Sequence, residues 1–187
     1  MESILLVSSS EKGRSAVSQL LTGTGQVHTA ANGSEARRIL SQTDFSLIVI
    51  NAPLIDEPGH ELAVMITENS TAGVILLVKC DLADELSDRL EPYGVFVVGK
   101  PLNRALFYQA VRLTLATRNR LLGLRSENIK LQTKIEEIRL IDRAKCALIQ
   151  YLNMSEPQAH RYIEKQAMDM RKTRREVAEN ILKTYEV

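Results

Sequence analysis

The sequence predicts an α/β fold, with a five-stranded, doubly wound parallel sheet that is followed by a region built only of helices. Over the first 117 residues, five short apolar runs alternate with segments of helical periodicity. Beyond this point the alternation stops and apolar residues recur every three or four positions. The charge also changes sign, because residues 1–117 hold 9 Lys and Arg against 13 Asp and Glu, whereas residues 118–187 hold 15 against 10. We therefore expect two parts with different tasks, of which the basic one faces a polyanion.

The first part contains the strands and helices of the predicted sheet. Short apolar runs of this kind are typical of strands that are buried on both faces of a parallel sheet, with the intervening helices as crossover connections. Ligands of such sheets bind at the carboxyl ends of the strands. The predicted strands are residues 4–7, 27–30, 47–50, 74–78 and 95–98, and the predicted helices are residues 11–21, 35–40, 61–68, 82–90 and 102–116.

A heptad pattern follows in residues 118–138, which we predict to be a helical linker. The apolar positions are spaced alternately by three and four residues over about two and a half heptads, as in a coiled coil. One polar residue within the pattern is of the kind that fixes register and a two-stranded state. We expect a homodimer through this seam, and the alternative is a single amphipathic helix packed on its own domain. The seam consists of Leu121, Leu124, Asn128, Leu131, Ile135 and Ile138.

Residues 139–187 predict a small domain of three helices. The linker helix continues to about Leu152, and two further helices begin at capping boxes, Ser155 with Gln158 and Thr173 with Glu176. Apolar residues recur at helical spacing in both of these helices, which predicts a shared core.

Basic residues are concentrated in this domain. Residues 161–175 carry six Lys and Arg against two acidic residues. Arg174 and Arg175 fall in the first turn of a helix, where the helix dipole disfavours cations. Residues that are locally unfavourable in this way are often retained for a function. The alternative is a solvated basic face without a partner. The candidate nucleic-acid contacts are Lys145, Tyr151, Arg161, Lys165, Arg171, Lys172, Arg174 and Arg175; Lys145 could instead be a structural residue.

The first 117 residues resemble the receiver domain of two-component response regulators. The resemblance rests on residues 4–7, on "TAANGSEA" (29–36), on "DFSLIVINAPLIDEPGHEL" (44–62) and on "VVGKP" (97–101). In that family two acidic residues hold Mg²⁺, an Asp accepts the phosphoryl group, and a Ser or Thr and a Lys complete the pocket. Here those positions are occupied by Ser8 and Ser9, by Asn51, and by Lys79 and Lys100. Only the Lys is retained, so we expect a receiver that cannot be phosphorylated on Asp.

The C-terminal residues 141–182 resemble the ANTAR domain, the RNA-binding output module of certain antitermination regulators. The matching residues include "AK" (144–145), "MSEPQAHRYI" (154–163), "QAMD" (166–169) and "REVAENIL" (175–182). The resemblance implies a dimer that binds stem-loops in mRNA leaders and prevents a terminator from forming, with RNA polymerase involved only indirectly. It also implies a sensor or sequestering protein as a candidate partner.

Other classes of function find little support in the sequence. We expect no enzyme activity, cofactor or metal, because no phosphate-binding loop, dinucleotide fingerprint or Cys/His ligand spacing occurs. We expect a cytoplasmic protein without a membrane segment, whose Cys80 and Cys146 are ordinary buried thiols. Two alternatives to RNA binding remain open: a DNA-binding transcription factor with a helix-turn-helix, and a protein-interaction adaptor that works through the receiver-like domain.

Overall fold

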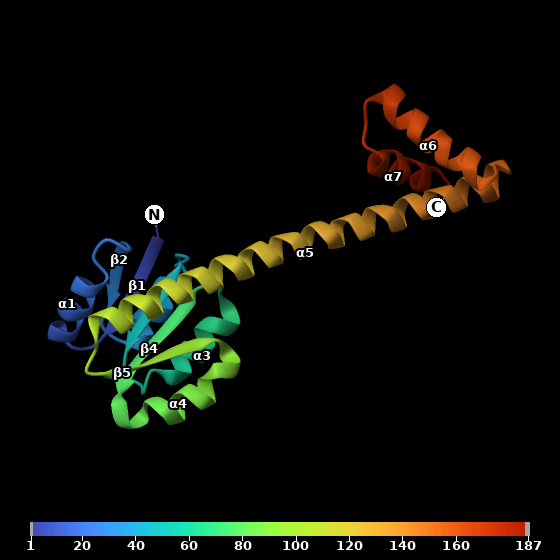
Figure 1. The fold of residues 1–187 in the computed structure, drawn as a ribbon. Coiled ribbons are helices and arrows are strands. Elements are labelled where there is room, and N and C mark those ends of the chain that lie inside the picture. Colours follow the sequence, from blue (N-terminus) through green and yellow to red (C-terminus); the bar gives the residue numbers. More distant parts are fainter. Residues whose placement is uncertain (1, 186–187) are drawn as a thin grey trace. The chain divides into compact units, whose positions relative to one another are not determined.

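The computed structural model describes residues 2–185 and forms two compact units that divide after Gly123. The first unit holds a five-stranded parallel sheet with strand order β2-β1-β3-β4-β5 (Figure 1). This confirms the predicted doubly wound α/β fold. Its elements are β1 (Glu2–Ser8), α1 (Glu11–Leu20), β2 (Gly25–Ala30), α2 (Gly33–Leu40), β3 (Leu47–Asn51), α3 (His60–Asn69), β4 (Gly73–Lys79), the 3-10 turn η1 (Cys80–Leu82), α4 (Ala83–Leu90), the 3-10 turn η2 (Glu91–Tyr93), β5 (Val95–Lys100) and the start of α5 (Arg104–Leu152).

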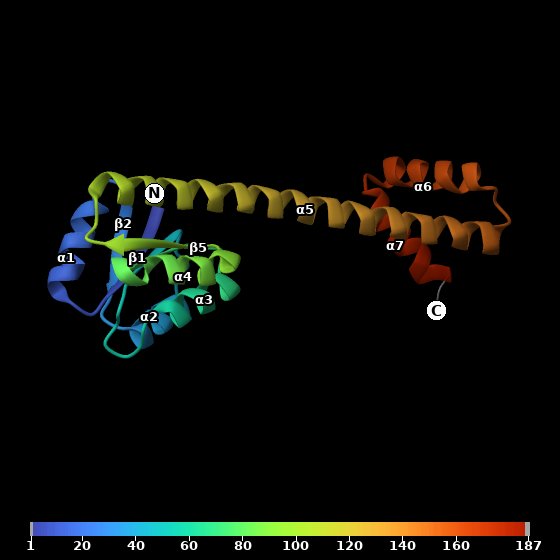
Figure 2. The same ribbon diagram turned by 60° about the horizontal axis from the view of Figure 1, so that its bottom comes forward.

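Two apolar cores cover the two faces of this sheet. Alternate strand residues such as Leu5 and Ile48 pack against α2, α3 and α4, where Leu62 is fully buried. The intervening residues, such as Leu6, pack against α1 and the first turns of α5, where Phe107 is buried. Figure 2 shows α1 and α5 on one side of the sheet and α2 and α3 on the other. Burial on both faces explains why the strands are continuous apolar runs.

Helix α5 is 49 residues long and continues without a break through the segments predicted as a fifth helix and as a linker. Its sequence contains no proline and a single glycine, Gly123, so nothing in it interrupts the helix. The part of α5 from Leu124 onward belongs to the second unit, together with α6 (Glu156–Met170) and α7 (Arg174–Tyr185). Ala147, Leu148, Ile163 and Ile181 are buried in the core that these helices share.

The prediction that both cysteines are buried is wrong. Cys80 lies in η1 at the end of β4, and Cys146 lies in α5 directly before the buried Ala147; both cysteines are exposed. Sequence alone does not distinguish a small apolar residue of a core from one on the adjacent helix face. Among the helices of residues 2–185, none has the length and apolar character that crossing a bilayer requires.

Candidate functional site

The carboxyl ends of the strands bring polar residues together in the first unit. Ser8 ends β1 and is paired in register with Asn51 at the end of β3. Lys79 and Lys100 end β4 and β5 and are paired in the same way. This edge of the sheet is where the resemblance to receivers places the phosphorylation site.

These residues form a connected hydrogen-bond network. The ammonium of Lys100 donates to Asn51 Oδ1 at 3.1 Å and to the backbone carbonyl of Ala52. The amide of Asn51 donates to Ser8 Oγ at 3.0 Å, and Ser8 is fully buried. Ser8 Oγ in turn donates to the carbonyl oxygen of Ser10. The amide and hydroxyl groups thus satisfy one another, where a receiver would gather carboxylates.

The charge at this edge is positive. Burial lowers the pKa of Lys100, and the nearby charge of Lys79 lowers it further. The oxygen atoms in the network are those of an amide, hydroxyls and carbonyls, and Ser9 Oγ already accepts the backbone N–H of Ile55 at 2.8 Å. Mg²⁺ prefers carboxylate oxygens, so this set of donors does not fit that ion. Within the part of the chain that the structure describes, no group of three or more His, Cys, Asp or Glu side chains could hold a metal.

The second unit carries the basic residues on its surface. Helix α6 buries Ala159, Ile163 and Ala167, which leaves Arg161 and Lys165 exposed on its outer face. Arg171, Lys172, Arg174 and Arg175, in the loop before α7 and in its first turn, are exposed as well. We call Arg161, Lys165, Arg171, Lys172, Arg174 and Arg175 the basic surface.

The ion pairs of the basic surface are few and solvent-exposed. Arg174 lies 3.7 Å from Glu164, and Arg175 lies 3.1 Å from Glu179. Among residues 2–185, neither Arg161 nor Lys165 has an acidic side chain within ion-pair distance. Most of the positive charge is therefore not neutralised within the chain.

The backbone at Arg171 is unusual. Helix α6 ends there with φ 52° and ψ 41°, in the left-handed region, and the N–H of Lys172 bonds to the carbonyl of Ala167 at 3.0 Å. Glycine is the usual residue at this position of a helix end, because a side chain is disfavoured in that conformation. Arg171 occupies this position instead, so an exposed cation lies in the turn between α6 and α7.

The seam residues of α5 lie on the surface of the single chain. Leu121, Leu124, Leu131, Ile135 and Ile138 are each about half exposed or more, up to 61% for Leu131. Asn128 is exposed between them. Ile129, which is not part of the heptad pattern, is also 55% exposed.

Solved structures of receiver domains resemble the first unit. The receiver domain of an HD domain-containing protein from Pseudomonas fluorescens aligns with a TM-score of 0.59 at 24% identity, covering 65% of this chain and 92% of that one. A crystal structure of an adenylate cyclase from Rhodopirellula baltica aligns with a TM-score of 0.62 at 20% identity, covering 69% and 97%. At these identities the likeness establishes the receiver fold and nothing about activity.

The second unit matches a family by sequence. The model of the ANTAR domain matches residues 130–182, from the later turns of α5 into α7. Transcriptional regulatory protein PdtaR of Mycobacterium tuberculosis is 25% identical over 158 residues, which cover 84% of this chain and 77% of that protein. Residues 130–182 therefore match the ANTAR family, and they follow a unit that has the receiver fold.

Within the ANTAR domain, Lys145 is neutralised by two acidic side chains. Its ammonium lies 2.8 Å from Asp142 and 2.9 Å from Glu156, and only 17% of its side chain is exposed. The hydrogen bond to Asp142, followed by that to Glu156, raises the pKa of Lys145. Lys145 therefore ties α5 to the first turn of α6. It also lines a pocket of about 210 Å³ together with Arg174 of the basic surface.

Tyr151 has an aromatic partner at the far end of the chain. Its ring stacks on Tyr185 of α7, with centroids 5.4 Å apart and planes inclined by 19°. Tyr151 is nevertheless 52% exposed. The position of Tyr151 near the basic residues is evident in the sequence, but its stacking partner is not, because no local pattern connects residues 34 positions apart.

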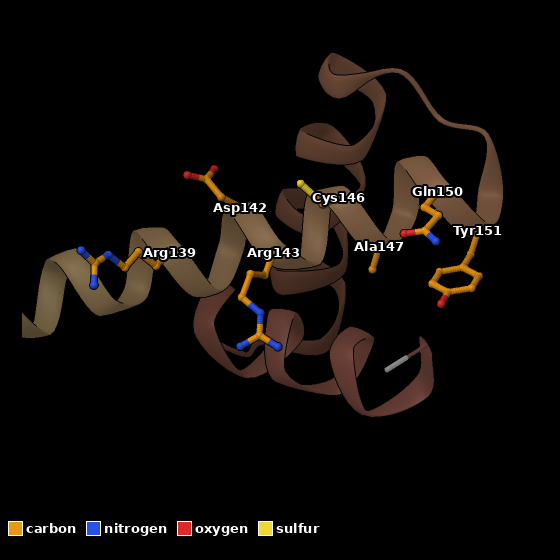
Figure 3. Close-up of a pocket in the computed structure, with 7 residues that line it drawn as sticks. All are labelled: Arg139, Asp142, Arg143, Cys146, Ala147, Gln150 and Tyr151. Carbon is orange, nitrogen blue, oxygen red and sulfur yellow. The ribbon is translucent and has the colours of Figure 1, made fainter. Parts of the chain in front are cut away.

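A pocket of about 600 Å³ on α5 was not predicted from the sequence. Figure 3 shows the side chains that line it on successive turns of this helix. Its signal in the sequence is a stripe of polar and basic residues at helical spacing, which does not follow the apolar heptad pattern. The lining residues are Arg139, Asp142, Arg143, Cys146, Ala147, Gln150 and Tyr151.

Proposed function

We propose that this regulator binds stem-loops in mRNA leaders through its ANTAR domain and, as a homodimer, prevents a terminator hairpin from forming. The observation that carries the proposal is the basic surface, six exposed cations that lie within the matched domain. RNA polymerase is affected only indirectly, through the structure of the transcript.

Two features of the basic surface are unfavourable for stability and therefore support a role in binding. Arg174 and Arg175 place cations at the positive end of the α7 dipole. Arg171 occupies a left-handed backbone position that costs a non-glycine residue about 1–2 kcal/mol. Local costs of this kind are expected at functional sites.

The chemistry of these side chains suits a folded RNA. Lys and Arg neutralise phosphates and release their counterions, which supplies affinity for any nucleic acid. Sequence in RNA is read mainly in loops, where splayed bases stack on aromatic rings or guanidinium planes. Arginine predominates in the basic surface, and it can serve both purposes because its guanidinium is planar and always charged.

We infer that the exposed seam of α5 is the dimer interface. Its apolar side chains follow the spacing of a coiled coil, and pairing with a second copy removes them from water. Asn128 within the seam favours a two-stranded, in-register pair.

We further infer that the receiver takes no phosphoryl group. An amide such as that of Asn51 is not a nucleophile toward a phosphodonor, and Ser8, Ser9 and Asn51 offer no carboxylate for Mg²⁺. The signal then enters through a partner, a sensor or sequestering protein that contacts the receiver. If a pull-down from host lysate recovers no such protein with the receiver, the activity of the regulator is set by its expression level instead.

The test is a gel shift at matched salt with a hairpin RNA and a duplex DNA of equal charge. We expect the hairpin RNA to bind more tightly, with an affinity that falls as salt rises. Tighter binding of the DNA would favour a helix-turn-helix factor, with residues 170–173 as its turn. No affinity for either would favour an adaptor that works through the receiver.

A further inference from the structure

The pocket on α5 combines the groups that recognise a single nucleobase. Its volume of about 600 Å³ lies within the range of small-ligand sites. Its lining residues recur along one side of the helix, so that cationic, amide and aromatic groups follow one another over about three turns (Figure 3). None of these residues except Tyr151 belongs to the contacts predicted from the sequence.

The aromatic end of the pocket is ordered before any ligand arrives. Stacking on Tyr185 uses one face of the Tyr151 ring, while half of the side chain stays exposed at the pocket. A ring held in this way loses little conformational entropy when a base stacks on it. Gln150, on the preceding position, has an amide that can donate to and accept from a base edge.

The other end of the pocket favours an anion. Arg139 and Arg143 lie four residues apart on the same side of α5, so their charges act together. Asp142 also lines the pocket, but its carboxylate is paired with Lys145 at 2.8 Å. Lys145 thus offsets the acidic group of the pocket that would repel a phosphate.

We propose that this pocket receives an unstacked base from the loop of a hairpin RNA. The base stacks on Tyr151, Gln150 hydrogen-bonds to its edge, and Arg139 with Arg143 contacts the adjacent phosphate. The inference rests on the proposed RNA binding and adds the class of ligand, a loop nucleotide. The basic surface then supplies affinity for the phosphate backbone, and the pocket supplies the preference for a loop over a paired stem.

The two exposed cysteines allow a direct test on the full chain. Cys146 lies in the pocket, whereas Cys80 lies in the receiver unit and serves as an internal reference. The probes are a hairpin RNA with a loop of adenines and a blunt duplex RNA with the same stem. The measurement is the rate at which N-ethylmaleimide modifies each cysteine, followed by mass spectrometry.

We expect the hairpin to slow modification of Cys146 several-fold and to leave Cys80 unchanged, with weaker protection by the duplex. If the hairpin binds in a gel shift but Cys146 reacts at its free rate, the pocket inference is overturned while RNA binding stands. If neither RNA binds, the proposed function fails and this inference fails with it. Protection that appears without RNA as protein concentration rises would assign the pocket to a second copy and overturn the inference.

Variants of Tyr151 give the second readout. Tyr151→Ala should reduce the preference for hairpin over duplex by about fivefold to a hundredfold, the range observed when a base-stacking ring is removed. Tyr151→Phe keeps the ring and should keep the preference. Because Tyr151 is half exposed, both variants are expected to fold, and their melting temperatures check this. Equal preference in wild type and Tyr151→Ala would contradict the stacking contact.

Discussion

Replacing Arg174 and Arg175 together with alanine separates a binding role from a merely solubilising one. Both side chains lie in the first turn of α7 and are about half exposed. If they contact RNA phosphates or bases, affinity falls while the fold is retained. If they only keep the domain soluble, affinity for RNA is unchanged.

The stability effect can be worked from the structure and is close to zero. The double variant loses the pairs of Arg174 with Glu164 at 3.7 Å and of Arg175 with Glu179 at 3.1 Å. Exposed ion pairs of this kind contribute about 0–1 kcal/mol each. Removing two cations from a helix N-terminus returns about 0.3–1 kcal/mol each, so the two effects offset one another.

The affinity effect is expected to be much larger. Each good contact to RNA contributes on the order of 1–3 kcal/mol, so we expect the double variant to bind hairpin RNA at least about tenfold more weakly. Its melting temperature should match that of wild type or exceed it. If the arginines neutralise phosphates, the slope of log affinity against log salt should also become shallower, by about one unit for each phosphate that the variant no longer neutralises.

The assay is a salt series of RNA-binding titrations and a thermal melt on the same preparations. Arg38→Ala with Arg89→Ala is the matched control, because it removes the same charge from exposed positions in the receiver unit. The control should retain nearly full affinity. Unchanged affinity in the Arg174 and Arg175 variant would refute the reasoning and would indicate that these residues form a solvated basic face without a partner.

Three further predictions concern assembly, phosphorylation and pH. Leu131→Lys together with Ile135→Lys should yield monomers in sedimentation, because charge enters the exposed apolar seam; an unchanged dimer would place the interface elsewhere. Incubation with acetyl phosphate and Mg²⁺ should leave the intact mass unchanged, and an adduct that depends on Asn51 would contradict the inactive receiver. The N–H of Thr173 lowers the pKa of Glu176 below its ordinary 4.5, so its stabilisation is present above that pH and is lost as pH falls through the folded-state pKa. Glu176→Gln keeps a capping side chain without the charge and should therefore lose less stability than wild type between neutral pH and about pH 3 in thermal melts; equal losses would contradict this role.

The fold was predictable because its signals are local. Buried parallel strands are continuous apolar runs, and the helices between them begin at recognisable caps. The same local signals did not show that α5 runs without a break from Arg104 to Leu152. The hydrophobic pattern changes along this segment, although no residue in it interrupts the helix. The exposure of Cys146 also depends on which side of α5 carries the core, which only the packing of α6 and α7 decides.

The candidate sites depended more on tertiary structure. Lys100 meets Asn51, 49 positions away, because the topology places the ends of β3 and β5 at one edge of the sheet. Lys145 could be a contact or a structural residue by sequence, and its pairing with Glu156 of α6 was visible only once the helices were packed.

The central claim, RNA binding by the ANTAR domain, is tested most directly by ultraviolet cross-linking of the protein to RNA in its host, followed by sequencing of the bound fragments. The account predicts leader transcripts that share a stem-loop beside a terminator. It also predicts that these cross-links are lost when Arg174 and Arg175 are replaced with alanine and kept in the Arg38 and Arg89 control. Cross-linked RNA without a shared stem-loop, or equal recovery from both variants, would contradict it.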